Sequence, residues 1–203
     1  MNIKYISVAA ILSISMASAL ANDWYVVGSV GQSKAKDYKS SFDSGLPGGG
    51  LTSNMDDKDT GYKVQLGYKF NPNWAIEGGY VDLGKFNYNA TYTGGNASGQ
   101  VKVDGWNLVG VGTVPINDQF SLFGKLGFID AKVEGSLYST TPGNSGSASK
   151  TKGRANWGVG ANYNVTKAWG LRAEWERFSK LGDSGTMGES DVDLLSVGAV
   201  FNF

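Results

Sequence analysis

The segment at 169–178, WGLRAEWERF, alternates between apolar and charged side chains, and this alternation limits what the chain can fold into. Side chains of an extended strand point to opposite faces in turn, so the segment is a ribbon with two different faces. One face is apolar with a tryptophan at each end, and the other carries Arg172, Glu174 and Glu176. In a soluble sheet the apolar face turns toward a core, whereas in a membrane barrel it turns outward and the charges face the lumen.

Eight segments share this period-two pattern, which predicts eight β-strands. Three connections between them are short and have the composition of tight turns, and four are long and rich in Gly, Ser, Asn and Thr. Short and long connections alternate strictly, which is typical of outer-membrane barrels with short periplasmic turns and longer external loops. The predicted strands are 23–32, 60–70, 74–84, 100–114, 119–131, 154–165, 169–181 and 190–203. The predicted long connections are 33–59, 85–99, 132–153 and 182–189.

Large aromatic side chains collect near both ends of the apolar face, as the two interfacial girdles of a membrane barrel require. The opposite face reads as a poor hydrophobic core, because it carries many ionisable groups and glycines, and burying unpaired charges is costly. It therefore predicts a charge network inside the barrel. The expected girdle residues are Trp24, Trp74, Tyr80, Trp106, Phe120, Phe128, Trp157, Tyr163, Trp169 and Trp175. The expected lumen network is Lys63, Glu77, Lys125, Arg172 and Glu174.

A soluble lipocalin-like carrier also has eight up-and-down strands, and alternation alone does not separate it from a membrane barrel. The two girdles, the strict alternation of connection lengths and the aromatic end of the last strand favour the membrane. After residue 21 no apolar run is long enough for a helical span, so strands must do the spanning. We predict an all-β fold, an eight-stranded antiparallel up-and-down transmembrane β-barrel.

The first 21 residues have the layout of a secretory signal peptide. Lys4 supplies a positive start, 6–14 is mostly apolar, and Ala19-Leu20-Ala21 is a small-x-small cleavage site. The apolar run falls short of the roughly 20 residues that a transmembrane helix needs. We expect 1–21 to be removed and 22–203 to form one outer-membrane barrel domain.

Cysteine and histidine are both absent, which removes disulfides, the commonest zinc ligands and the commonest general base. Glu174 and Glu176 are spaced for paired-carboxylate chemistry, but packing against Arg172 and Lys125 is the favoured interpretation. The 18 basic residues less Lys4, set against the 18 acidic residues, give a net charge of −1. We therefore expect no enzyme activity, metal, cofactor or nucleic-acid partner.

Several stretches together resemble the OmpA-like transmembrane domain, an eight-stranded barrel of the Gram-negative outer membrane: GYKVQLGYKFNPNWAIEGGYVDLG, VPINDQFSLFGKLGFIDAK, GVGANYNVTKAWGLRAEWERF and LLSVGAVFNF. The resemblance runs from Trp24 to Phe203 apart from the external loops. It implies that Phe201 and Phe203 form the signal read by the barrel-assembly machinery. It also implies a charge-closed interior, here rearranged by Val111 and Asn162. The sequence ends at the barrel, so the periplasmic peptidoglycan-binding domain of larger relatives is not expected.

These features predict a structural and surface-interaction role in the cell outer membrane, with weak porin-like ion conductance through a charge-plugged lumen. A dedicated small channel is the alternative. Expected partners are outer-membrane lipids and lipopolysaccharide, the barrel-assembly machinery during biogenesis, and a host surface or phage at the external loops. Basic side chains of the long connections are candidates for contact with lipid A phosphates: Lys34, Lys36, Lys39, Lys150, Lys152 and Arg154.

Overall fold

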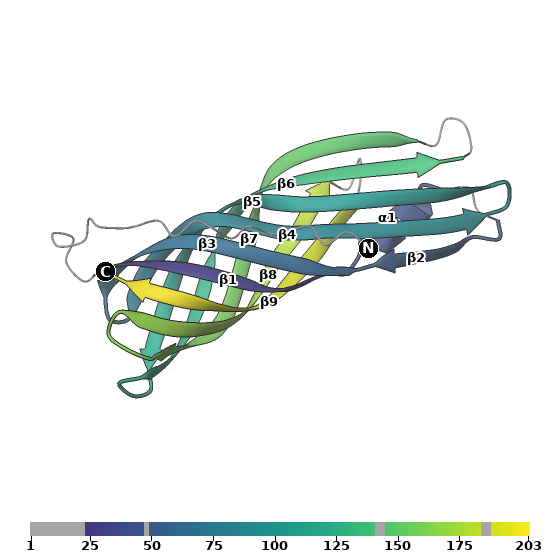
Figure 1. Ribbon diagram of the computed structural model, residues 1–203. Helices are drawn as coiled ribbons and strands as arrows, with labels where there is room; N and C mark the ends of the chain where they lie inside the picture. The colour runs from purple at the N-terminus through teal and green to yellow at the C-terminus, as the bar shows by residue number, and fades with distance from the viewer. Residues whose placement is uncertain (1–22, 47–48, 141–144, 184–187) are drawn as a thin grey trace.

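The computed structural model describes residues 23–46, 49–140, 145–183 and 188–203, and the segment predicted as a signal peptide lies outside these ranges. The described chain forms nine β-strands and one short helix (Figure 1). Within it, no helix is long and apolar enough to cross a bilayer. In chain order the elements are β1 (Trp24–Ala35), α1 (Tyr38–Ser44), β2 (Thr52–Asp56), β3 (Lys58–Asn71), β4 (Trp74–Tyr92), β5 (Gly95–Pro115), β6 (Phe120–Ser139), β7 (Gly146–Asn164), β8 (Trp169–Asp183) and β9 (Gly188–Asn202).

Eight of these strands close into an antiparallel barrel, as predicted. Around the barrel the strands pair in the order β1, β3, β4, β5, β6, β7, β8 and β9, and β1 pairs with β9 to join the ends of the sheet. The ninth segment, β2, pairs with β4 at 87–91, beyond the level where β3 leaves β4 at Asp82. Strand β2 therefore takes the place of β3 beside β4 after a break at Asp57, and the barrel has eight strands around its circumference.

The three short turns lie at one end of the barrel and form where side chains cap the chain reversal. Asn71 Oδ1 accepts hydrogen bonds from the backbone N–H groups of Asn73 and Trp74. Asn117 Oδ1 accepts in the same way from the N–H groups of Gln119 and Phe120, and Thr166 Oγ1 accepts from the N–H of Trp169. Such side-chain acceptors mimic backbone turns and fix tight reversals. We call this the short-turn end, and the opposite end the outer end.

The predicted extent of two long connections is wrong. Strands β4 and β5 continue to a hairpin between Tyr92 and Gly95, and β6 and β7 extend to Ser139 and Gly146. Most of 85–99 and 132–153 is therefore strand, and the inward side chains of β4, β5 and β6 at this level pack in a hydrophobic interior. Figure 1 shows these strands projecting past the rest of the barrel at the outer end. The connection 33–59 is also ordered in part, since it holds α1 and β2.

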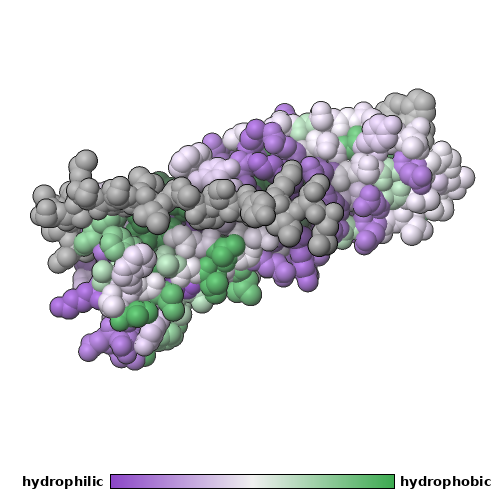
Figure 2. Space-filling model, viewed as in Figure 1, coloured by the Kyte–Doolittle hydropathy of each residue, from purple (hydrophilic) through white to green (hydrophobic). Residues whose placement is uncertain are grey.

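The outside of the barrel changes character along its length. Near the short turns the outward side chains are large and apolar, and Phe70, Trp74 and Val114 are each more than 60% exposed. Farther out the outward positions are polar or charged. Figure 2 shows hydrophobic residues gathered over the half nearer the short turns, and hydrophilic or neutral residues over the other half.

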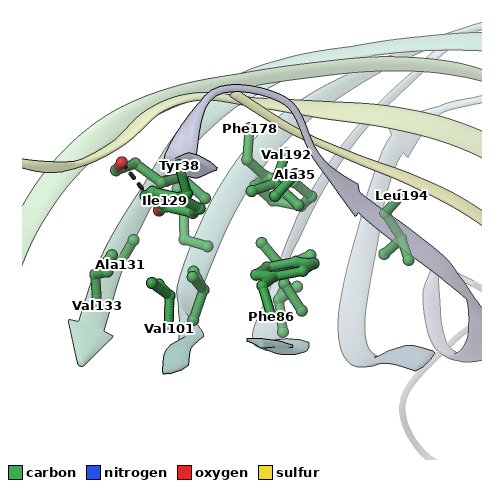
Figure 3. Packing of buried hydrophobic residues seen from close by; sticks show 14 residues of the cluster. Ala35, Tyr38, Phe86, Val101, Ile129, Ala131, Val133, Phe178, Val192 and Leu194 are labelled. Carbon is green, nitrogen blue, oxygen red and sulfur yellow. Dashed lines mark hydrogen bonds between the residues drawn. The ribbon is translucent and has the colours of Figure 1, made fainter. Parts of the chain in front are cut away.

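The inward side chains change in the opposite direction, from mostly charged in the half near the short turns to apolar in the outer half. The expectation that the inward face is a poor hydrophobic core is therefore wrong for the outer half. A small apolar cluster around Tyr25, Val27 and Phe123 lies nearest the short turns. Charged residues follow, and above them lies a buried cluster that we call the apolar plug (Figure 3). The apolar plug consists of Ala35, Tyr38, Val81, Leu83, Phe86, Val101, Val103, Ile129, Ala131, Val133, Phe178, Leu181, Val192 and Leu194.

Candidate functional site

The five residues predicted as a lumen network all lie inside the barrel and are nearly inaccessible to solvent. They come from four strands: Lys63 from β3, Glu77 from β4, Lys125 from β6, and Arg172 and Glu174 from β8. None of these positions is on the lipid-facing parity, so strand geometry alone turns each side chain inward. The structure brings all five into one connected cluster, which also includes Glu176.

Glu77 is the centre of the half of the network nearer the short turns. Its Oε1 accepts hydrogen bonds from Arg172 Nη1 at 2.7 Å and from the Tyr25 hydroxyl at 2.7 Å. Its Oε2 lies 2.9 Å from Lys125 Nζ. The Arg172 guanidinium is held further by Asn162 Oδ1, which accepts from Nε at 2.8 Å. Asn162 stands where the resemblance implied an acid, and it binds the arginine as a neutral acceptor.

Glu174 and Glu176 form the half nearer the apolar plug. Lys63 Nζ contacts Glu174 Oε1 and lies 2.5 Å from Glu176 Oε2. Lys125 Nζ lies 3.1 Å from Glu174 Oε2 and so joins the two halves. Asn156 Nδ2 donates to Glu176 Oε1 at 2.6 Å. The network therefore contains three cations and three carboxylates, which makes it formally neutral.

Every carboxylate oxygen in this network has a donor, so the geometry matches packing rather than catalysis. A general base needs a free oxygen within reach of a substrate proton. Glu174 and Glu176 both contact the ammonium group of Lys63, and their side chains are at most 2% exposed. Pairing of this kind offsets the large desolvation cost of six buried charges.

The lumen is closed a second time by the apolar plug, on the outer side of the network. The Tyr38 ring on α1 is fully buried, and its hydroxyl donates to the backbone oxygen of Leu181 at 3.0 Å (Figure 3). Phe86 and Phe178 are also fully buried in this layer. On the other side, a cavity of about 370 Å³ at the short-turn end is lined by Tyr25 and Arg172. Water at that end therefore meets the first side chains of the network.

The helix α1 is fixed over the outer end by contacts with β4 and β2. Phe42 stacks on Tyr88 with ring centroids 4.8 Å apart, and the Tyr88 hydroxyl donates to Asp43 Oδ1 at 2.5 Å. Burial raises the pKa of Asp43, but hydrogen bonds from Ser53, Tyr88 and Lys39 outweigh burial and hold that pKa below its usual value. Burial, together with the hydrogen bond to Asp43, raises the pKa of Tyr88.

The predicted girdle residues fall at two levels of the barrel wall. We call the level near the short turns the inner belt and the other the outer belt. In the outer belt, the rings of Tyr80 and Trp106 are 5.6 Å apart and those of Trp157 and Trp175 are 5.0 Å apart. The inner belt contains Trp24, Trp74, Phe120, Tyr163 and Trp169, and the outer belt contains Tyr80, Trp106, Phe128, Trp157 and Trp175.

The last aromatic residues of the chain lie at the inner belt. Phe201 packs on Trp169 with ring centroids 4.7 Å apart and meets Phe203 edge-on at 5.2 Å. The backbone N–H of Phe203 donates to the oxygen of Trp24, which ties the end of the last strand to the first. The role of this pair as an assembly signal stays a prediction.

Basic side chains of the long connections are largely paired with nearby carboxylates. Lys36 lies 3.2 Å from Asp193, Lys39 lies 2.9 Å from Asp43, and Arg154 lies 2.6 Å from Glu189. Lys34 and Lys152 make similar pairs with Asp57 and Asp183. These contacts order the outer end, whereas Lys150 is exposed.

Sequence reasoning left several residues out of the site. Glu176 was recognised as inward-facing but not as the third anion, although three cations in one lumen require three partners. Tyr25 and Asn156 donate to the network from positions where nothing in the sequence distinguishes them. The apolar plug had a readable signal, since Val101, Val103 and other inward positions of the outer strand ends are aliphatic or aromatic.

Comparison with known proteins gives a consistent set of matches. Residues 19–203 match the family model of the OmpA-like transmembrane domain. The chain is 28% identical over 98% of its length to Outer membrane protein A of Serratia marcescens, covering 54% of that protein. It is 27% identical over 90% of its length to Outer membrane protein A of Klebsiella pneumoniae, covering 51% of that protein. The chain thus spans about half the length of these relatives.

Solved structures of similar fold are outer-membrane barrels with low sequence identity. Neisserial surface protein A has a TM-score of 0.53 at 13% identity, with 89% of this chain and 97% of that chain covered. OprG from Pseudomonas aeruginosa has a TM-score of 0.51 at 16% identity, with 90% and 96% covered. Ail from Yersinia pestis, solved in complex with the heparin analogue sucrose octasulfate, has a TM-score of 0.50 at 17% identity, with 89% and 99% covered.

Proposed function

Because the chain belongs to the OmpA-like transmembrane domain family and is therefore a multi-pass outer-membrane β-barrel of a Gram-negative bacterium, we propose that it acts as a closed scaffold that presents its outer half to the surroundings. The exposed aromatic belts suit contact with lipid rather than with water. A soluble periplasmic carrier does not fit this family or this surface.

The observation that carries the proposal is the double closure of the lumen. The charge network fills the barrel at one level, and the apolar plug fills it at the next. An eight-stranded barrel has an interior that side chains just fill, and here both layers consist of buried side chains. A scaffold needs no path through its centre, and this arrangement offers none that water or ions could use without rearrangement.

A dedicated channel is the weaker candidate. If the charge pairs exchanged partners, ions would still have to cross the apolar plug, where Phe86, Phe178 and Leu181 are fully buried. Hydrophobic constrictions block ions because they do not replace the hydration shell. Weak porin-like conductance would thus require both layers to open at once, and we propose that it is not the physiological role.

Planar-bilayer recordings with matched variants test this proposal. We expect the wild-type protein, Glu77→Ala and Phe178→Ala to show no stable conductance steps, and the double variant Glu77→Ala/Phe178→Ala to conduct. The control is Glu134→Ala, which removes an exposed charge paired with Lys132 outside the lumen. Stable steps from the wild-type protein that Glu77→Ala alone changes would favour the channel and overturn the scaffold proposal.

The scaffold role also has a cellular test. Deleting the protein should make the envelope more sensitive to detergent while uptake of small solutes stays unchanged, and expression of the wild-type chain should restore resistance. Slower solute uptake with normal detergent resistance would point to transport instead. As partners we propose membrane lipids and lipopolysaccharide at the wall, the barrel-assembly machinery at Phe201 and Phe203, and a host surface or phage at the outer half.

A further inference from the structure

The outward face of β4 to β7 passes through three chemical layers along the same strands. The outer belt is aromatic, with Trp106 67% and Phe128 70% exposed. The next outward positions are charged, and we call them the charged layer: Lys85, Lys102, Asp104, Asp130, Lys132 and Glu134. The positions beyond carry amides and hydroxyls, and we call them the neutral layer: Asn87, Asn89, Ser98, Gln100, Ser136 and Tyr138.

The charged layer begins directly above the outer belt and contains three lysines on neighbouring strands. Lys85 of β4 is in register with Lys102 of β5, and Lys132 stands on β6. Lys102 lies 3.2 Å from Asp104, and Lys132 lies 2.6 Å from Glu134, and the two lysine side chains are 34% and 47% exposed. Exposed pairs of this kind are weak and exchange readily for a stronger anion such as a phosphate.

The neutral layer contains no acidic or basic side chain at the outward positions of 87–91, 96–100, 136–140 or 145–147. Gln100 Nε2 donates to Asn87 Oδ1 across the strands at 3.1 Å, which holds two amides side by side on the outward face. A groove of about 600 Å³ crosses this layer and is lined by Asn89, Ser98 and Tyr138. A second, separate groove of about 450 Å³ is lined by Lys85 and Lys102 of the charged layer and by Gln100 of the neutral layer.

This chemistry fits an uncharged sugar chain. Amides and hydroxyls both donate and accept hydrogen bonds, as sugar hydroxyls do. The Tyr138 ring is 68% exposed and offers an apolar platform for the carbon face of a sugar ring. Because the layer lacks charge, it has no strong attraction for a sulfated sugar, an acidic peptide or a nucleic acid.

We propose that the outward face of β4 to β7 binds lipopolysaccharide of its own leaflet lengthwise, with the lysines of the charged layer at its phosphates and the neutral layer along its uncharged sugars. The order of the layers carries this choice, since acyl chains, phosphates and sugars follow one another in the same order in that lipid. From Trp106 to Asn96 the strand runs roughly 33 Å, at about 3.3 Å per residue. The inference rests on the proposed scaffold function and specifies one of its partners.

The test compares two forms of lipopolysaccharide, one with its full uncharged sugar chain and one trimmed back to its phosphate-bearing inner part. Protein in phospholipid nanodiscs is titrated with each form, and bound lipid is counted by native mass spectrometry. The wild-type chain should bind the full form about tenfold more tightly than the trimmed form. The double variant Ser98→Glu/Tyr138→Ala should lose this difference and bind the trimmed form as before.

Two further variants make the result specific. Lys85→Gln/Lys102→Gln/Lys132→Gln should weaken binding of both forms alike, and Asn73→Glu, which adds a charge at the short-turn end, should change neither. Equal wild-type affinity for the two forms, or equal weakening of both by the neutral-layer variant, would overturn the inference. So would tighter binding of a free neutral oligosaccharide than of full lipopolysaccharide, which would indicate a host glycan. Failure to insert into nanodiscs would instead count against the scaffold function itself.

Discussion

Between its two aromatic belts the barrel is apolar outside and ionic inside, and beyond the outer belt the same strands are polar outside and apolar inside. On β6 the change occurs over a few residues: Phe128 is outward and 70% exposed, whereas Ile129 is inward and fully buried. Below this level the inward residue is Lys125, and above it the outward residues are Asp130 and Lys132. The backbone continues through the change without interruption.

The difference shows that strand parity and chemical character are set independently. Hydrogen bonding of the ladder fixes which side chains point inward, and the surrounding solvent decides what those side chains must be. In lipid the wall needs apolar groups outside, so the charges collect in the lumen. In water the ordinary rule returns, and the outer half is stabilised by the hydrophobic effect as in a soluble sheet protein.

The largest expected effect is the loss of an anion from the membrane half. Glu77→Ala leaves Lys125 and Arg172 with too few partners, and breaking a buried pair in this way costs about 3–5 kcal/mol. Unfolding in urea, followed by the heat-dependent shift in gel mobility, measures the change. The control Glu134→Ala removes an exposed partner and should cost under about 1 kcal/mol. Equal effects from both variants would show that the lumen network is solvated.

Removing an aromatic from the apolar plug should cost nearly as much, for a different reason. Phe178→Ala deletes a fully buried ring and leaves a cavity, which typically costs about 3–4 kcal/mol. Hydrogen exchange should rise mainly at the outer ends of β4, β5 and β8, while the membrane half stays protected. Uniform loss of protection would mean that the two halves unfold as one unit and would weaken the contrast between them.

A charge placed on the same outward face should be tolerated in one half and rejected in the other. Val197→Arg puts a cation between the belts, at a side chain that is 63% exposed, and should cost about 2–4 kcal/mol. Thr151→Arg, at an outward position of the outer half, should change stability by less than about 0.5 kcal/mol. Refolding into lipid vesicles measures both. Tolerance of Val197→Arg would be incompatible with lipid at that position.

The smallest effect concerns pH and α1. Because the folded-state pKa of Asp43 is depressed, its contribution to stability is present above its unfolded pKa of about 4 and is lost as pH falls through the lower folded value. Tyr88→Phe removes one donor, costs about 1 kcal/mol, and should raise the Asp43 pKa toward its ordinary value. Titration of the Asp43 carboxyl carbon by NMR measures the shift, and an unchanged midpoint would contradict the assigned contact.

Strand number, order and facing were readable from sequence because period-two alternation persists across the membrane half. Trp74, Ile76 and Tyr80 are all even-numbered and all point outward, because the lipid requires apolar side chains on that face. The outer half was harder to read because β4 changes parity at a bulge between Asp82 and Gly84. Gly84 takes a φ of +83°, which favours glycine, and after it the inward residues are even-numbered instead of odd.

The inward position of each lumen charge was predictable from the sequence, but the pairing between the charges was not. Inward parity is enough to place Lys63 and Glu174 inside the barrel. It does not show which ammonium meets which carboxylate, because that depends on the stagger between strands that are not neighbours in the sheet. The polar composition of 85–99 and 132–153 also concealed their strands, since Ser, Asn and Thr are as common on a wet strand face as in a loop.

The charge network has a consequence for how the barrel is put together. Its members come from β3, β4, β6 and β8, and Lys63 and Glu174 are separated by 111 residues in the chain. A partly assembled sheet that entered lipid before these strands met would carry unmatched ions into a medium that rejects them. The charge network therefore favours insertion into lipid only when every strand that contributes to it has taken its correct place.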